Sequence, residues 1–152
     1  MPLDPTVVGT ELPTATMTVD RGRLRFFAKA IGETDPKYTD VAAARAAGHP
    51  DLPVPPTFLF SIELEAPDPF SYLSALGVDL RRVLHGEQSF VYHAMAYPGD
   101  ELLATPRISD VYTKKAGALD FIAKDTRITR ADGTVIADLQ SLIVIQNPGG
   151  TA

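Results

Sequence analysis

Residues 27–38 bring together side chains that can transfer protons. The segment reads Phe-Ala-Lys-Ala-Ile-Gly-Glu-Thr-Asp-Pro-Lys-Tyr, so Glu33, Asp35 and Tyr38 lie close together along the chain. A carboxylate can accept a proton, which makes Glu33 a candidate general base. A phenol, with an ordinary pKa near ~10, donates a proton but is a poor base at neutral pH, so Tyr38 is a candidate acid. The plainer interpretation is that Asp35 braces the turn before Pro36 and that Tyr38 packs its ring.

The three histidines are His49, His85 and His93. His49 precedes an apolar segment; it is either a substrate-binding residue at the start of that segment or an exposed loop histidine. Strict strand alternation predicts that His85 and Glu87 share one face. There they are candidates for an acid–base pair between subunits, and the alternative is a polar solvent face or dimer seam. No histidines stand at i and i+4 of a helix with a third ligand, so we expect no metal.

Composition limits the partners. The chain has 152 residues and a formal net charge of −5. That length suits a single domain, residues 1–152, with a substantial core. The negative charge argues against nucleic acid as a partner. Basic residues at helical spacing form either a solvated helix face or a docking site for acyl carrier protein or coenzyme A phosphates: Arg21, Arg23, Arg25 and Lys29.

Several classes of protein are excluded. No cysteine is present, which removes disulfides and cysteine nucleophiles. No Gly-rich phosphate loop or Gly-x-Ser-x-Gly elbow occurs, and we expect no cofactor. No apolar run reaches the ~18–20 residues of a membrane span. Residues 1–5 do not start a secretory signal. We therefore expect a cytoplasmic protein with no membrane partner.

The first half of the chain predicts short helices. Asp20 is an N-cap candidate, because its carboxylate can accept orphan backbone N–H groups. Apolar residues then recur with helical spacing up to residue 31, and Gly32 is a stop signal. Asp40 precedes a second helix at 41–47. Residues 57–64 follow a Pro-rich stretch and are apolar nearly all round, which predicts a buried helix.

The second half predicts strands at 83–95, 101–112, 119–129 and 135–145, after an early strand at 14–19. A tight turn at residues 131–133 joins the last two strands. One buried helix followed by long antiparallel strands indicates an α+β fold in which a curved sheet wraps around the helix.

Three stretches resemble the MaoC-like family of (R)-specific hydratases and dehydratases. They are residues 27–38, the Leu-Pro-Val-Pro-Pro-Thr-Phe run at 52–58, and residues 84–90 with the Pro-Gly-Asp turn at 98–100. The resemblance covers residues 6–146 and is closest to N-terminal-type domains, which include subunits of mycobacterial (3R)-hydroxyacyl-carrier-protein dehydratases. It implies the hot-dog fold and a dimer, since edge-strand pairing with a second copy completes that fold.

The resemblance also implies a chemistry. The family removes water reversibly from 3-hydroxyacyl thioesters, using an Asp and a His in the first stretch. Here Glu33 stands at the Asp position, Tyr38 at the His position and Asp35 at an Asn position. At the start of the central helix, the N–H groups of Thr57 and Phe58 are expected to stabilise the thioester oxygen. The alternative is that they simply begin the helix.

The altered pair leaves four functions open. The first is a dehydratase or hydratase for 3-hydroxyacyl or trans-2-enoyl thioesters of CoA or acyl carrier protein. In it, Glu33 or His85 would take the place of the family's Asp and His pair. The second is a non-catalytic acyl-chain-binding subunit of a heterodimeric dehydratase, whose partner keeps the Asp and His. A hot-dog thioesterase ranks last, because Glu63 and Glu65 lie too far along the central helix. The fourth is a binding module for a small hydrophobic ligand. The expected assembly is a homodimer, or a heterodimer with another hot-dog chain.

Overall fold

The computed structural model describes residues 3–148, so both ends of the predicted domain lie outside the described residues. Within that range, antiparallel strands form one curled sheet in the order β1-β3-β4-β5-β2. All of the predicted strands are confirmed, with ends that differ by a few residues. The strands are β1 (Ala15–Thr18), β2 (Val83–Tyr92), β3 (Glu101–Lys114), β4 (Leu119–Arg130) and β5 (Val135–Gln146).

The helices are short, and most of them precede strands β2–β5 in the sequence. The α-helices are α1 (Arg21–Ala30), α2 (Val41–Ala46) and α3 (Ser71–Ala75). The 3-10 turns are η1 (Pro5–Val7), η2 (Pro36–Tyr38), η3 (Phe58–Glu65), η4 (Leu80–Arg82) and η5 (Lys115–Gly117). Both predicted N-caps are confirmed: Asp20 accepts from the Arg23 N–H at 3.1 Å, and Asp40 from the Ala42 N–H at 3.0 Å.

The central helix is the 3-10 helix η3. The Phe60 N–H donates to the Thr57 carbonyl at 3.4 Å, the i to i−3 backbone bond of a 3-10 helix. Phe58, Leu59 and Ile62 are buried as expected. The expectation that residue 64 belongs to the buried surface is wrong: Leu64 is exposed, and Glu63 is buried instead. The reason is that the sheet covers only one side of η3.

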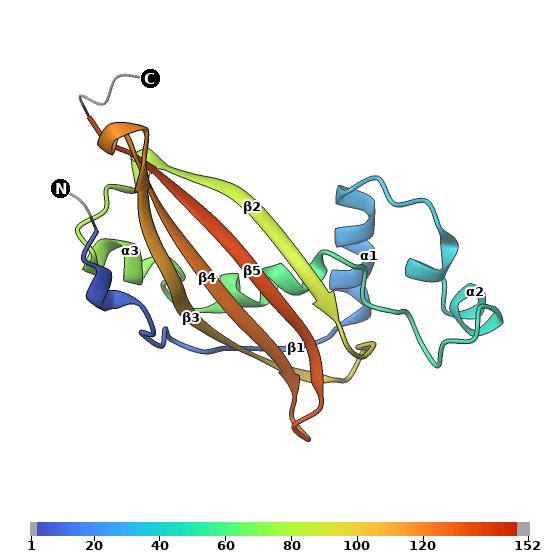
Figure 1. Cartoon of the computed structure of the whole chain (residues 1–152). Coiled ribbons are helices and arrows are strands. Elements are labelled where there is room, and N and C mark those ends of the chain that lie inside the picture. The colour runs from blue at the N-terminus through green and yellow to red at the C-terminus, as the bar shows by residue number, and fades with distance from the viewer. Residues whose placement is uncertain (1–2, 149–152) are drawn as a thin grey trace.

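The main core lies between η3 and the inner face of the sheet. Leu24 of α1 and Leu52 of the Pro-rich loop close it at one end, and Ile128 and Leu139 contribute from the strands. Figure 1 shows η3 running behind the sheet, with α1 and α2 on one side and α3 on the other. The predicted α+β hot-dog fold is confirmed. Among the described residues, no helix is long and apolar enough to span a membrane.

A β-bulge at Gly86 interrupts the alternation of β2. His85 pairs with Ile143 of β5, whereas Glu87 pairs with the adjacent Leu142. A Cβ on Gly86 would lie 2.7 Å from the Val144 side chain, closer than real Cβ atoms come. Because neighbouring residues of β5 point to opposite faces, the bulge sends His85 to the inner face and Glu87 to the outer face.

Candidate functional site

Glu33 lies in the loop that follows α1, and its carboxylate caps that loop. One oxygen, Oε1, accepts from the backbone N–H groups of Thr34 and Asp35, both at 2.9 Å. Figure 1 shows this part of the chain projecting beyond the end of β2 together with α2. The observed bonds give Glu33 a structural role in holding the turn. We call residues 31–50 the overhanging segment.

Asp35 braces the turn, as its plainer interpretation predicted. Its carboxylate accepts from the Lys37 N–H at 3.1 Å and pairs with the Lys37 ammonium at 3.0 Å. The hydrogen bonds from Lys37 hold the pKa of the Asp35 carboxyl below its usual range. The Tyr38 side chain is half-buried, and the Lys37 ammonium lies 5.0 Å from its ring centre. Burial, and next the nearby Tyr38, raise the pKa of Tyr92 at the end of β2 to about 12.

His49 is half-buried and bonded, rather than exposed in a loop. Its Nδ1 lies 2.9 Å from the Tyr97 hydroxyl, and the two rings pack at 5.9 Å. His49 therefore fixes the end of the overhanging segment against the loop that contains the Pro-Gly-Asp turn.

The start of η3 is not the pair of free donors that the sequence predicted. The Phe58 N–H donates to the Pro55 carbonyl at 3.0 Å, and the Phe58 ring is buried against Phe27 in an edge-to-face contact at 5.4 Å. Thr57 is exposed at the N-cap, and its side chain makes no capping hydrogen bond. The expectation for Phe58 is therefore wrong, because a preceding turn already uses its N–H group.

The predicted His85–Glu87 pair is also wrong, because the Gly86 bulge separates the two side chains. His85 stacks on Phe60 of η3 with ring centres 5.1 Å apart. Its Nε2 lies 3.1 Å from the Gln88 Oε1, which also accepts a 2.5 Å hydrogen bond from Ser141. Leu84, the residue before His85 on the strand, is exposed.

His85 lies at a largely apolar pocket of about 410 Å³ at the C-terminal end of η3. We call it the η3 pocket. The sequence did not predict this pocket, because its walls come from elements far apart along the chain. These are η3, the segment that contains α3, and the strands β2 and β5. Its apolar lining includes Phe60, Leu64, Phe70, Leu73, Leu80 and Ile143. A cavity of this size and lining matches the usual character of small-molecule sites.

A buried ion pair lines the η3 pocket. The Glu63 carboxylate is bonded by the Lys124 ammonium and by the Thr126 hydroxyl. Glu63 is 8% exposed and Lys124 is 7% exposed. A buried charge is tolerated only when it is paired and hydrogen-bonded, so the two residues depend on each other. Glu63 is thus committed to Lys124, and Glu65 pairs with Arg23 at 2.8 Å on the surface.

Tyr72 of α3 completes the polar part of the pocket. The Lys124 ammonium lies 5.5 Å from the centre of the Tyr72 ring. Burial, and then the negative charge of Glu63, raise the pKa of Tyr72 to about 12. The phenol is therefore protonated at neutral pH and can act as a hydrogen-bond donor.

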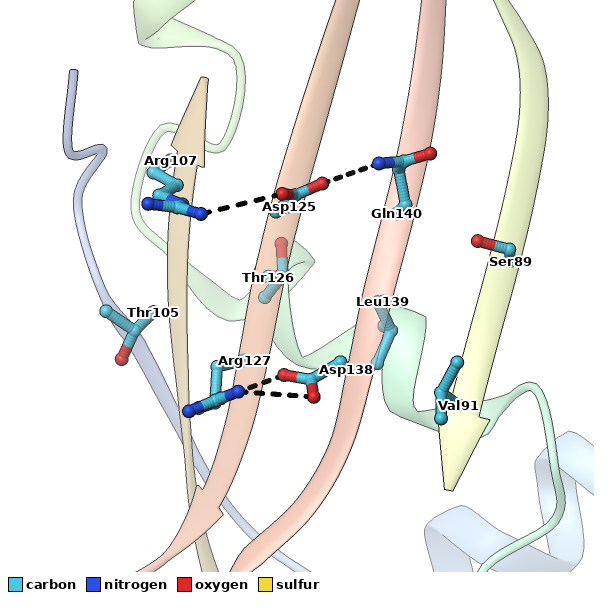
Figure 2. Close-up of a pocket in the computed structure, with 10 residues that line it drawn as sticks. All are labelled: Ser89, Val91, Thr105, Arg107, Asp125, Thr126, Arg127, Asp138, Leu139 and Gln140. Carbon is cyan, nitrogen blue, oxygen red and sulfur yellow. Dashed lines mark hydrogen bonds and ion pairs between the residues drawn. The ribbon is translucent and has the colours of Figure 1, made fainter. Parts of the chain in front are cut away.

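A second hollow of about 610 Å³ lies on the outer face of the sheet, and its charges cancel. Figure 2 shows Arg107 and Gln140 beside Asp125, and Arg127 beside Asp138. The Arg127 Nε to Asp138 Oδ1 distance is 2.8 Å. With each guanidinium matched by a carboxylate, this face gives no excess positive charge for a phosphate.

Two of the four basic side chains on α1 are neutralised by carboxylates. Arg21 pairs with Asp51 at 2.6 Å, Arg23 pairs with Glu65, and the Arg25 Nε donates to the Thr39 carbonyl at 2.8 Å. This favours the solvated-face interpretation over docking of a phosphate. Among residues 3–148, no group of three or more His, Asp or Glu side chains could hold a metal ion.

Comparison with known proteins agrees with the fold and with the resemblance. Residues 6–139 match the family model of the FAS1-like, dehydratase domain region. A UPF0336 protein of Saccharopolyspora erythraea is 36% identical over 153 residues, covering 100% of this chain and 95% of that protein. A second UPF0336 protein, from Streptomyces coelicolor, is 44% identical over 112 residues, covering 73% of this chain and 75% of the relative.

Solved structures share the fold at low sequence identity. A chain of the HadBC (3R-hydroxyacyl-ACP dehydratase) complex from Mycobacterium tuberculosis superposes with a TM-score of 0.73 at 22% identity, covering 91% of this chain and 96% of that one. A MaoC-like dehydratase gives a TM-score of 0.79 at 24% identity, covering 93% of this chain and 43% of that one. The resemblance to MaoC-like dehydratases is confirmed.

Proposed function

The chain belongs to the FAS1-like dehydratase domain region family, and on that premise we propose that it is the acyl-chain-binding subunit of a heterodimeric dehydratase or hydratase. The substrate class is a 3-hydroxyacyl or trans-2-enoyl thioester of CoA or acyl carrier protein. The proton transfers are assigned to a second hot-dog chain that keeps the Asp and His of the family segment.

The observation that carries this proposal is the state of the overhanging segment. Glu33 occupies the position of the family's Asp, but its carboxylate accepts two backbone N–H groups of its own loop. Tyr38 occupies the position of the family's His, and a phenol is a poor base at neutral pH. His49 lies within hydrogen-bond distance of the Tyr97 hydroxyl, and His85 lies within hydrogen-bond distance of the Gln88 side-chain oxygen.

The edge of the sheet supports a partner. β2 is an edge strand of ten residues without lysine or proline, the residues that usually protect an edge from pairing. Val91 is 58% exposed and Leu84 is 51% exposed on this strand. After the bulge at Gly86, residues 87–92 form a regular run, and such an edge with exposed apolar side chains is suited to pairing with a strand of another chain.

Antiparallel pairing of the β2 edges would also bring the η3 pocket of this chain next to the partner's overhanging segment. His85, beside the η3 pocket, and Tyr92, beside the overhanging segment, are roughly 20 Å apart, since a strand advances about 3.3 Å per residue. The segment of this chain is therefore too far from its own pocket to act there. In an antiparallel β2 pair the start of one strand faces the end of the other. The partner's overhanging segment then lies beside the η3 pocket of this chain.

The proposal is tested by reconstitution. The chain is purified alone, and also co-expressed with each hot-dog chain of the same genome that carries the intact Asp and His. We expect crotonyl-CoA hydration by one such complex and none by the chain alone. Glu33→Gln in this chain should leave the activity of the complex unchanged. Turnover by the chain alone that is lost in Glu33→Gln would instead make this chain the catalyst.

The pairing edge is tested with a matched pair of lysine substitutions. Val91→Lys places a charge on β2 and should weaken association with the partner. Thr16→Lys places the same charge at an exposed position of β1, the other edge, and should leave association unchanged. Sedimentation of the two complexes reports the difference. Equal association of both variants would show that β2 is not the interface.

A further inference from the structure

We propose that the η3 pocket selects an acyl chain that carries a neutral oxygen, a hydroxyl above all, on its distal part. This deepens the proposed function, on which it rests, by naming the substrate class. The observation that carries it is an ion pair and a phenol at a pocket whose remaining lining is apolar apart from His85 and Ser141. A plain alkyl chain would require only the apolar walls.

The polar groups that line the pocket retain unused hydrogen-bonding capacity. A lysine ammonium has three N–H donors. Among the described residues, the hydrogen-bond acceptor of the Lys124 ammonium is Glu63 alone. The Tyr72 hydroxyl likewise makes no hydrogen bond within residues 3–148, and its pKa is raised, so it keeps its proton. A ligand oxygen at this place can accept from Lys124 or Tyr72.

The charges of the pocket favour a neutral ligand oxygen over a carboxylate. Glu63 and Lys124 cancel each other, so a neutral ligand leaves the buried site neutral. A carboxylate end would add a negative charge, and an unpaired buried charge is costly. The one further basic side chain among the described residues of the pocket is His85, which lies toward the β2 edge and is bonded to Gln88. A hydroxyl fits best, because it can accept from Lys124 and donate to a free lone pair of Glu63. A ketone oxygen can make the first contact but not the second.

The rest of the pocket suits the remainder of such a chain. Phe60, Leu73 and Ile143 offer apolar contact over the methylene groups, and His85 stands on the side of the β2 edge. In the proposed heterodimer the thioester lies toward that edge, beside the partner's overhanging segment. The hydroxyl then meets Lys124 away from the reacting carbons.

The test uses two probes that differ by one oxygen. S-octanoyl-pantetheine and S-(8-hydroxyoctanoyl)-pantetheine are titrated into the full chain by calorimetry, with no turnover required. Hydrogen bonds to charged groups are stronger than neutral ones, so we expect the hydroxylated probe to bind about tenfold more tightly. The double variant Glu63→Gln/Lys124→Met replaces both charges with neutral groups of similar length and should remove this preference.

A matched control removes an ion pair elsewhere. Arg127→Met/Asp138→Asn deletes the pair on the outer face seen in Figure 2 and should keep the preference. Equal binding of the two probes to the wild-type chain would overturn the inference and leave the proposed function standing. A preference that survives in the triple variant Glu63→Gln/Lys124→Met/Tyr72→Phe, which also removes the phenol, would overturn it as well. If neither probe binds, the pocket is not an acyl site, and the proposed function falls together with this inference.

Discussion

Removing one charge of the Glu63–Lys124 pair should destabilise the protein far more than removing both. Both side chains are more than nine-tenths buried, and each is the main countercharge of the other. Lys124→Met leaves the Glu63 carboxylate with the Thr126 hydroxyl as its remaining partner. Glu63→Gln leaves the Lys124 ammonium against the Tyr72 ring. An uncompensated buried charge costs about 3–5 kcal/mol, and we expect that loss in the free energy of unfolding of each single variant.

The double variant should recover most of this loss. Glu63→Gln/Lys124→Met has no buried charge, and glutamine can still accept from Thr126. Replacing a buried pair by neutral residues of similar volume is often close to neutral, so we expect a free energy of unfolding within about 1 kcal/mol of wild type. Additive losses would amount to about 6–10 kcal/mol, so the predicted coupling between the two sites is large.

Urea denaturation followed by circular dichroism measures these free energies, and equal slopes show that the unfolded states are comparable. At roughly 2–4 °C per kcal/mol for a domain of this size, each single variant should melt roughly 6–20 °C below wild type. Arg127→Met is the control, since it breaks an exposed ion pair and should cost at most about 1 kcal/mol. Losses near 1 kcal/mol in both single variants, or additive losses in the double variant, would refute the reasoning.

Three further outcomes follow from single contacts. Gly86→Ala puts a Cβ 2.7 Å from the Val144 side chain, so it should cost about 1–3 kcal/mol of stability, and adding Val144→Ala should restore part of it. Burial, and then the charge of Glu63, raise the pKa of Tyr72 to about 12 in the folded protein. An unfolded phenol loses its proton near pH ~10, so stability is full below that pH and falls by about 2–3 kcal/mol on the way to pH ~12. In Tyr72→Phe, the free energy of unfolding should no longer show this part of the decrease, which urea denaturation at several pH values in this range measures. An unchanged decrease would contradict the raised pKa of Tyr72. Asp20→Ala removes the cap on the Arg23 N–H and should cost about 1 kcal/mol in thermal unfolding, whereas Asp20→Asn should not.

The candidate site could be predicted only in part, and the residues show why. Asp35 before Pro36 was recognisable as a turn brace, because that contact is made within three residues. Glu33 and Tyr38 were found by the family motif, but the motif could not show that the Glu33 carboxylate bonds to its own loop. Phe58 was misassigned, since a donor at a helix start is free only when the preceding turn leaves it unbonded.

By itself, the sequence determined the order and kind of the elements. Alternation marks the strands, and Asp20 and Asp40 mark helix starts through bonds to backbone groups two or three residues away. Such signals are local, so they can be recognised without knowing the fold. Only the tertiary structure decided where the polar groups meet. Glu63 and Lys124 lie 61 positions apart and pair because η3 packs on the inner face of β4. One extra residue at Gly86 turned His85 inward and Glu87 outward, because a shift of one residue exchanges the faces of a strand.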